Sequence, residues 1–137
     1  MPEPSARPVP AIGTYVDSRP FWDGARAGKL VLQYCLDTGR FQHYPRPVSV
    51  YTGSRNLAWR EVSGNGAVFA CTIARVPAPG FADLVPYAVA TVQLDEGVRI
   101  IARVVGCAPE DVAIGMRVKV AFEELGERRY PVFEPAA

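Results

Sequence analysis

The second half of the chain alternates apolar and polar positions with a period of two, which is typical of half-buried β-strands. A turn at 95–97 joins two of the alternating segments as a hairpin. A loop at 77–85 and a helical turn at 109–114 interrupt the others. Five short strands with one longer connection after the third fit a small closed barrel, although periodicity alone leaves its type open. The predicted strands are residues 68–75, 87–94, 98–105, 117–123 and 130–134.

The beginning of the chain predicts an arm followed by one short helix. Residues 1–14 include four prolines and are expected to be extended. The helix is expected to start at a cap at Asp17 or Ser18, to hold Pro20 in its first turn, and to stop at Gly28. A helix this short is marginal in water, so its apolar face should dock on another surface. That face consists of Phe21, Trp22 and Ala25.

Two turns with the same layout follow the predicted helix. The segment Cys35-Leu36-Asp37-Thr38-Gly39 matches Ser49-Val50-Tyr51-Thr52-Gly53 fourteen residues later, which is the layout of the two knuckles of a zinc ribbon. Structural zinc needs four thiolate or imidazole ligands, and hydroxyls do not supply them. Turn composition alone also produces Thr-Gly pairs by chance. If the scaffold is a ribbon, we expect it to hold no metal, because the four ligand positions are Cys35, Thr38, Ser49 and Thr52.

Several short motifs occur in the order and spacing of a known family. The chain resembles the bacterial and archaeal family that joins a rubredoxin-like zinc ribbon to an OB fold, called domain of unknown function 35. The resemblance covers about four fifths of the chain, but family members keep four cysteines where this chain keeps only Cys35. The matching pieces are Phe21-Trp22-Asp23-Gly24, Gly28-Lys29-Leu30, Cys35 with Gly39, Pro45-Arg46-Pro47, Gly53-Ser54, Pro86-Tyr87, Gly106-Cys107, Pro109 to Val112, Gly115 to Val118, and Pro131-Val132-Phe133.

The resemblance implies a mainly β fold in three parts. Residues 1–28 would form the arm and helix, 29–63 a degenerate ribbon, and 64–137 a five-stranded OB barrel. Strands at 30–34 and 57–62 would open and close the ribbon. Without metal, aromatic packing would have to hold the ribbon together. The aromatic side chains available for this are Tyr34, Phe41, Tyr44, Tyr51 and Trp59.

Composition narrows the class of protein. With 137 residues and 49% hydrophobic content, the chain is long enough to bury a core. A net charge of +1 with 21% charged residues does not indicate a highly basic nucleic-acid binder. No apolar run approaches the roughly 20 residues that span a bilayer, and the start lacks the order of a secretory signal, so we expect a cytoplasmic protein. Three cysteines, at 35, 71 and 107, do not suggest a disulfide framework.

The residues assemble no catalytic set. There is no histidine-centred triad, carboxylate pair or phosphate loop, and the single histidine, His43, has only aromatic and proline neighbours. Members of the resembled family act as small accessory subunits of acyl-CoA enzymes in lipid metabolism. The resemblance therefore implies a non-catalytic subunit of a thiolase-fold enzyme, an aldolase or a hydratase-fold enzyme. The expected cofactors are none, and no catalytic or metal-binding residue is assigned.

Two sets of side chains are candidates for binding. The helix and ribbon would dock on the enzyme partner, and the barrel with its loop would contact the acyl-CoA. Guanidinium groups suit its phosphates, and an aromatic ring suits stacking or acyl contact. The alternative for any one arginine is a solvated surface position. The partner-binding candidates are Phe21, Trp22, Phe41 and Tyr44, and the ligand-binding candidates are Arg46, Arg75, Phe81 and Arg103.

Two other functions stay open. OB barrels also bind single-stranded nucleic acid through a positive groove with stacking aromatic side chains. The nearly neutral charge and the few evident aromatic residues of the barrel strands rank this function second. A third possibility is a structural paralogue that stabilises a partner without touching substrate.

Overall fold

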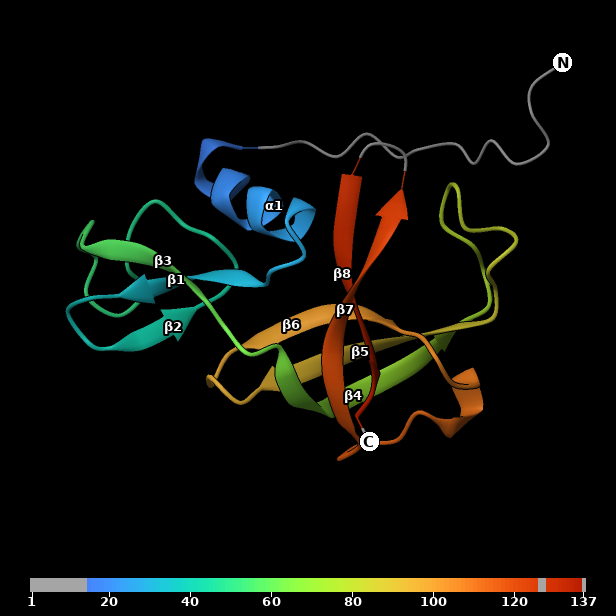
Figure 1. The fold of residues 1–137 in the computed structure, drawn as a ribbon. Helices are drawn as coiled ribbons and strands as arrows, with labels where there is room; N and C mark the ends of the chain where they lie inside the picture. The colour runs from blue at the N-terminus through green and yellow to red at the C-terminus, as the bar shows by residue number, and fades with distance from the viewer. Residues whose placement is uncertain (1–14, 126–127, 137) are drawn as a thin grey trace, which may run out of the picture.

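The structure, a computed structural model, describes residues 15–125 and 128–136. A short helix is followed by a three-stranded ribbon sheet and then by a closed five-stranded barrel (Figure 1). This confirms the predicted fold class; the predicted arm at 1–14 lies outside the described residues. The elements are α1 Arg19–Arg26, β1 Val31–Cys35, β2 Arg40–Gln42, β3 Leu57–Glu61, β4 Asn65–Ala74, β5 Tyr87–Leu94, β6 Arg99–Val104, β7 Arg117–Leu125 and β8 Arg128–Pro135, with 3-10 turns at Val16–Ser18 and Pro109–Asp111.

Helix α1 docks on the ribbon through its apolar face. Phe21 and Ala25 are buried, and a methyl group added to Gly24 would approach Val31 Cγ2 of β1 to 2.6 Å. The helix starts after Ser18 as predicted, but the Ser18 hydroxyl donates to the Tyr15 carbonyl and does not cap the helix. The expected docking of this short helix is therefore provided by β1 of the ribbon together with β8 of the barrel.

The ribbon keeps the geometry of two matched knuckles. In the first, the Gly39 N–H donates to the Cys35 carbonyl at 2.8 Å; in the second, the Gly53 N–H donates to the Ser49 carbonyl at 2.9 Å. Both glycines have positive φ, 70° and 75°, which glycine adopts without steric cost. Strand β1 lies between β2 and β3. The three-residue strand β2 was not predicted, because its segment shows no alternation.

The barrel closes in the order β4-β5-β6-β8-β7, with β6 and β8 parallel and the other pairs antiparallel. The register of β4 shifts between Val68 and Ala70, so this strand departs from simple alternation. After the bulge, residues 69–72 are all exposed. The predicted helical turn at 109–114 is only the 3-10 turn Pro109–Asp111, because the backbone is already extended at Val112.

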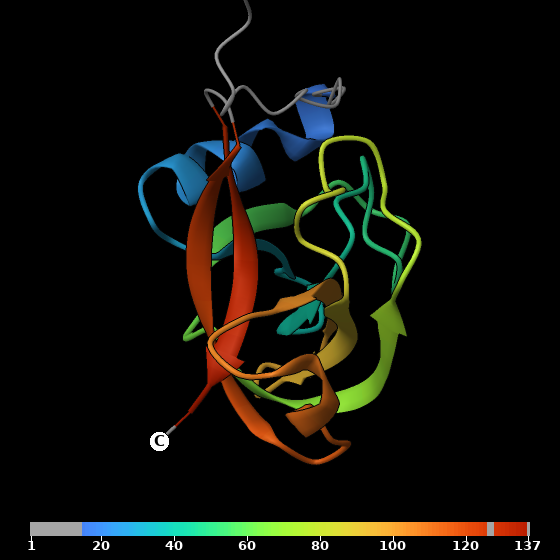
Figure 2. The ribbon, with the colours of Figure 1, turned by 90° about the vertical axis from the view of Figure 1, so that its right-hand side faces the viewer.

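The ribbon, helix and barrel share one core. Leu32 of β1 and Phe133 of β8 are both fully buried, and they belong to the same cluster of buried side chains as Phe21 of α1. Figure 2 shows the β7–β8 hairpin standing upright beside the helix, and the Arg129 side chain of β8 donates to the Arg26 carbonyl at 3.3 Å.

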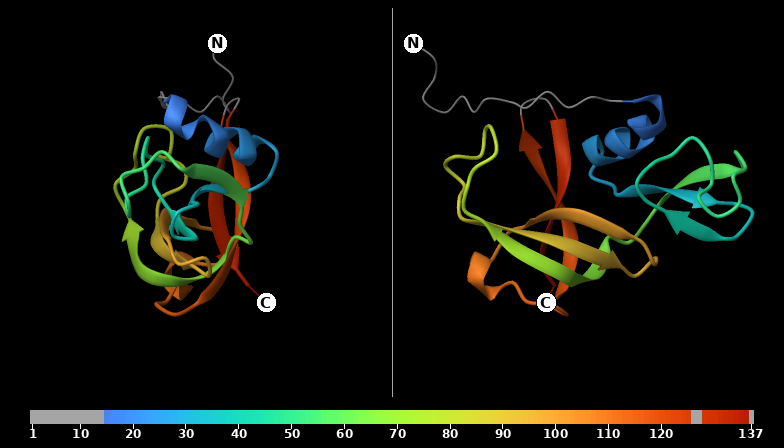
Figure 3. Two further views of the ribbon diagram at one scale, coloured as in Figure 1. Left: turned by 90° about the vertical axis from the view of Figure 1, so that its left-hand side faces the viewer. Right: turned by 180° about the vertical axis from the view of Figure 1, so that it is seen from behind.

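The segment between β4 and β5 projects from the end of the barrel that is opposite the ribbon, as Figures 1 and 3 show. The helix, the ribbon and this segment thus surround one side of the barrel. Within the described residues, no helix has the length and apolar character needed to cross a membrane.

Candidate functional site

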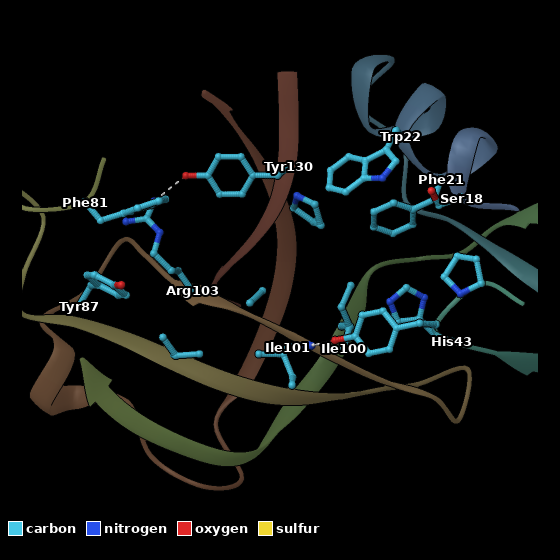
Figure 4. A pocket seen from close by; sticks show the side chains of 15 residues that line it. Ser18, Phe21, Trp22, His43, Phe81, Tyr87, Ile100, Ile101, Arg103 and Tyr130 are labelled. Atoms are coloured by element: carbon cyan, nitrogen blue, oxygen red, sulfur yellow. Dashed lines mark hydrogen bonds between the residues drawn. The ribbon is translucent and has the colours of Figure 1, made fainter. Parts of the chain in front are cut away.

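An apolar cavity of about 490 Å³ lies where the helix, the ribbon and the barrel meet (Figure 4). Aromatic and aliphatic side chains dominate its wall, and Arg103 is the charged side chain among them. We call this space the apolar cavity. It is lined by Ser18, Phe21 and Trp22 near or on α1, by His43, Tyr44 and Pro45 after β2, by Phe81, Tyr87 and Val89, by Ile100, Ile101, Ala102 and Arg103 of β6, and by Tyr130 and Pro131 of β8.

At the polar end of the apolar cavity, the charged side chain of Arg103 is paired with other side chains of the protein. Arg103 forms an ion pair with Glu123 of β7, and its side chain is only 11% exposed. The same guanidinium donates to the Tyr130 hydroxyl at 3.3 Å and lies 5.7 Å from the ring centres of Phe81 and Tyr87. Burial raises the pKa of Tyr130, so its phenol stays protonated at neutral pH. The positive charge of Arg103 is therefore balanced inside the protein.

At the other end, His43 lies between two aromatic rings. Its ring centre is 5.5 Å from Phe21 and 4.0 Å from Tyr44. Both ring nitrogens are buried and have no hydrogen-bond partner among the described residues. Burial lowers the pKa of His43 to about 4, so the imidazole is neutral at physiological pH. A neutral ring in this position extends the apolar wall and does not add charge to it.

His43 should make stability depend on pH. Its unfolded-state pKa is about 6.5, so between pH 6.5 and 4 the unfolded chain binds more protons than the folded one. The contribution of neutral His43 to the free energy of unfolding is therefore fully present above pH 6.5. The free energy of unfolding should fall by about 2 kcal/mol between pH 7 and pH 5. Urea unfolding at each pH measures this, and His43→Gln should remove the dependence. An NMR titration of this one histidine with a midpoint near pH 6.5 would contradict the prediction.

A second pocket, of about 430 Å³, lies between the ribbon and the β5–β6 turn. We call it the basic pocket, because it contains Arg46 and Arg99 and no carboxylate lines it within the described structure. His43 and Tyr44 line both this pocket and the apolar cavity. The two spaces are therefore neighbours with different chemistry. The full lining of the basic pocket is Gln42, His43, Tyr44, Arg46, Val50, Tyr51, Gln93, Gly97, Val98 and Arg99.

The backbone of Arg46 is held from inside the ribbon. The buried side chain of Gln33 donates to the Arg46 carbonyl at 2.7 Å and accepts from the Arg46 N–H at 2.8 Å. Gln42 extends the network by donating to Gln33 Oε1 at 2.7 Å and accepting from the Val50 N–H at 2.9 Å. These buried amides fix the segment that presents the Arg46 side chain, which is exposed. Sequence reasoning missed both glutamines, because their role depends on the strand pairing.

The structure brings together five of the eight predicted binding residues. A sixth, Arg46, lines the basic pocket, and two lie in neither space. Phe41 packs against Tyr34 inside the ribbon, with ring centres 5.0 Å apart, and Arg75 is exposed just after β4. The five residues that line the apolar cavity are Phe21, Trp22, Tyr44, Phe81 and Arg103.

Sequence reasoning did not identify Glu123 or Tyr130 as site residues. The two face each other across the β7–β8 pairing, and the Tyr130 hydroxyl donates to Glu123 at 3.3 Å. Arg103 reaches them from β6, so only the barrel topology brings the three side chains together. Alternation predicted the strands on which they lie but gave no indication of the contact.

The residues at the four zinc-ligand positions do not fit zinc. Ser49 donates its hydroxyl hydrogen to Cys35 Sγ at 3.1 Å, and Thr52 donates to the Asp37 carboxylate at 2.9 Å. The described residues contain no group of three or more His, Cys, Asp or Glu side chains able to hold a metal ion. Asp37 also accepts from the Asn56 side chain at 2.9 Å, so hydrogen bonds connect the two knuckles.

Aromatic packing in the ribbon is only partly as expected. The Tyr51 hydroxyl donates to the Phe41 carbonyl at 2.6 Å, and the Arg60 guanidinium lies 3.8 Å from the ring centre of Tyr34. Tyr44 instead faces the barrel, where its hydroxyl oxygen accepts from the Ile101 N–H at 3.3 Å.

We predict that the purified protein contains less than about 0.1 zinc per chain. Structural zinc contributes roughly 10 kcal/mol or more where four proper ligands hold it, and here one thiol stands among hydroxyls. Elemental analysis measures the content, and chelator treatment should leave the melting temperature unchanged. A content near one zinc per chain would show that other side chains supply the ligands.

Comparisons with known proteins agree with this geometry. A family model described as "ChsH2, rubredoxin-like zinc ribbon domain" matches residues 22–48, and one described as "ChsH2, C-terminal OB-fold domain" matches residues 59–123. A DUF35 domain-containing scaffold protein of Pyrococcus furiosus is 35% identical over 107 residues, which cover 78% of this chain and 79% of the relative. This chain belongs to the DUF35 family. The resemblance inferred from its short motifs is thereby confirmed.

Two longer relatives of this DUF35 protein are enzyme subunits. The probable enoyl-CoA hydratase alpha subunit of Thermomonospora curvata is 37% identical over 131 residues, 95% of this chain. The 3-oxo-4,17-pregnadiene-20-carboxyl-CoA hydratase alpha subunit of Mycobacterium tuberculosis is 34% identical over 120 residues, 87% of this chain. The chain spans only about two fifths of either subunit, 40% and 38% respectively.

Solved structures show the same fold. A chain of the Ltp2-ChsH2(DUF35) aldolase superposes with a TM-score of 0.84 and 33% identity, covering 93% of this chain and 100% of that chain. A DUF35 protein of unknown function from Sulfolobus solfataricus has a TM-score of 0.63 and 16% identity, covering 90% of this chain and 87% of that one. The second likeness concerns the fold alone.

Proposed function

We propose that this DUF35 protein is a non-catalytic accessory subunit of an acyl-CoA enzyme. Its partner would be a larger thiolase-fold or hydratase-fold subunit that carries the catalytic residues. The observation that supports this most is the match to the whole of a chain in the Ltp2-ChsH2(DUF35) aldolase, with a TM-score of 0.84. The names of the two hydratase alpha subunits point to the same class of enzyme.

The chemistry of the apolar cavity favours a non-catalytic role in binding substrate. A general base works best when its pKa lies near the operating pH. The pKa of His43 is well below that range, and the pKa of Tyr130 is raised above its ordinary value. Arg103 is paired with Glu123. The cavity thus provides an apolar wall and fixed hydrogen bonds, which can bind and orient a substrate for another subunit.

The helix and ribbon end of the molecule is the proposed docking surface. Aromatic side chains anchor interfaces because they bury a large area with few rotamers to freeze. Tyr15 is 75% exposed and Tyr44 is 50% exposed, and Trp22 lies half-buried between them in sequence. A partner placed there would cover the apolar cavity from the side of α1.

The proposed setting is the cytoplasm, in acyl-CoA metabolism. All three cysteines are free, although Cys71 is exposed, which fits a reducing compartment.

Co-expression with neighbouring genes tests the proposal. We expect a tagged form of this chain to retain a larger subunit through size-exclusion chromatography, with both chains in fixed ratio by native mass spectrometry. The purified complex should act on an acyl-CoA, and this chain alone should not. A chain that stays monomeric beside every neighbour, or binds oligonucleotides with a steep salt dependence, would favour the nucleic-acid function.

A further inference from the structure

We infer that an acyl-CoA is divided between the two neighbouring spaces of this chain. Its phosphates would contact Arg46 and Arg99 in the basic pocket, and its acyl arm would lie in the apolar cavity. His43 and Tyr44, which line both spaces, would flank the connecting part of the ligand. This inference rests on the proposed function for the class of ligand, and on the geometry for its direction.

The positive charge available in each space decides which end of the acyl-CoA lies in it. A phosphate needs a cation whose charge is not already balanced, because an internal carboxylate competes for the same donors. Arg103 pairs with Glu123 and is nearly enclosed. In the basic pocket, no carboxylate lines the wall within the described structure. The phosphates therefore belong with the basic pocket, although sequence reasoning assigned them to Arg103 as well.

In the basic pocket, the backbone of Arg46 and the side chain of Arg99 are held in place. Gln33 holds the backbone of Arg46 through both its N–H and its carbonyl. The Nε of Arg99 donates to Gln93 Oε1 at 2.8 Å, and its guanidinium lies 3.7 Å from the ring centre of Phe69. Stacking on one face and a bond at Nε leave the two terminal nitrogens of Arg99 for paired contacts with phosphate oxygens. The Arg99 side chain would then lose little rotamer freedom on binding.

The apolar cavity suits the other half of the ligand. The wall near the junction consists of Phe21, Ile100 and Ile101 together with the neutral ring of His43. An acyl chain gains free energy there in proportion to the apolar area removed from water, whereas a phosphate would lose its hydration. Figure 4 shows Tyr130 and Arg103 at the far end from His43, where the Tyr130 phenol and the guanidinium paired with Glu123 suit a neutral polar group better than a phosphate.

Three ligands separate the halves of the site. CoA carries the phosphates without an acyl arm, octanoyl-N-acetylcysteamine carries the acyl arm without phosphates, and octanoyl-CoA carries both. Each is titrated into the full chain, alone and in its enzyme complex, at two salt concentrations. We expect octanoyl-CoA to bind more tightly than either half, and the CoA affinity to fall at high salt.

Single substitutions show which space binds each half of the ligand. Arg46→Gln and Arg99→Gln should each weaken CoA binding about tenfold and leave octanoyl-N-acetylcysteamine unchanged. Arg75→Gln is the matched control, because Arg75 lies in neither space, and it should change nothing. Val89→Trp should fill the apolar cavity and abolish binding of octanoyl-N-acetylcysteamine. Ser18→Trp provides a second filling variant, at the helix edge of the cavity, if the first lowers the melting temperature.

Several results would overturn the inference. One is unchanged CoA affinity in both arginine variants of the basic pocket together with a loss in Arg103→Lys. Another is wild-type protein that assembles with its enzyme but binds none of the three ligands, which would leave a purely structural subunit and keep the proposed function. Conversely, divided binding without enzyme assembly would keep the site and remove the proposed function.

Discussion

Replacing Leu32 with alanine is expected to lower the free energy of unfolding by about 3 kcal/mol. Leu32 is fully buried in β1 and belongs to the cluster that joins the ribbon to the helix and the barrel. Truncation removes buried apolar area and leaves a cavity that the surrounding side chains only partly fill. Because no metal is expected to hold this ribbon, its attachment to the shared core should contribute most of its stability.

Urea unfolding followed by tryptophan fluorescence measures this loss. Leu36→Ala is the matched control, since Leu36 lies in the first knuckle of the same ribbon and is 46% exposed, and its effect should stay within about 0.5 kcal/mol. Both proteins should unfold in one transition. Two separate transitions in Leu32→Ala, with the barrel melting as in the wild type, would show that the ribbon and barrel are independent units.

Replacing Trp22 with alanine is expected to weaken binding of the enzyme partner about 30-fold or more. Trp22 lies half-buried on α1, lines the apolar cavity, and meets the ring of Phe21 edge-on with ring centres 5.0 Å apart. A large aromatic side chain at the centre of an interface typically contributes 2 kcal/mol or more. Surface-immobilised partner and purified variants give the dissociation constants, measured without any CoA ligand.

Trp59→Ala supplies the control for this experiment. Trp59 is the other tryptophan of the chain; it is half-buried on β3, packs against the same core, and lines neither space. The Trp59→Ala variant should lower the melting temperature about as much as Trp22→Ala does. Its affinity for the partner should stay within about threefold of the wild-type affinity. If both variants weaken the partner equally, the effect comes from lost stability, and the docking surface lies elsewhere.

The barrel could be predicted from the sequence because its strands alternate and its turns contain glycine. The exception is β4, where the bulge between Val68 and Ala70 breaks the alternation in the middle of a strand. Alternation also could not find β2, which is only three residues long and is held by its pairing with β1. These elements depend on tertiary pairing, which a local pattern does not contain.

The sequence predicted which kinds of residue form the candidate site better than it predicted which of them contact one another. Phe21, Trp22 and Tyr44 stood out as aromatic side chains in the first third of the chain, and all three line the apolar cavity. Which arginine is balanced by a carboxylate depends on contacts across β6, β7 and β8, so sequence alone gave Arg103 and Arg46 the same role. The burial of His43 depends likewise on the docking of α1.

The hydrogen-bonded knuckles have a consequence for the cell that makes this protein. A four-cysteine ribbon folds only when zinc is supplied, and oxidants that attack its thiolates release the metal. Here the Ser49 hydroxyl bonds to the buried Cys35 thiol and the Thr52 hydroxyl to the Asp37 carboxylate, while Gln33 and Gln42 fix the segment between the two turns. Folding of this subunit should therefore continue during zinc starvation and peroxide stress, conditions under which its four-cysteine relatives would lose their ribbons.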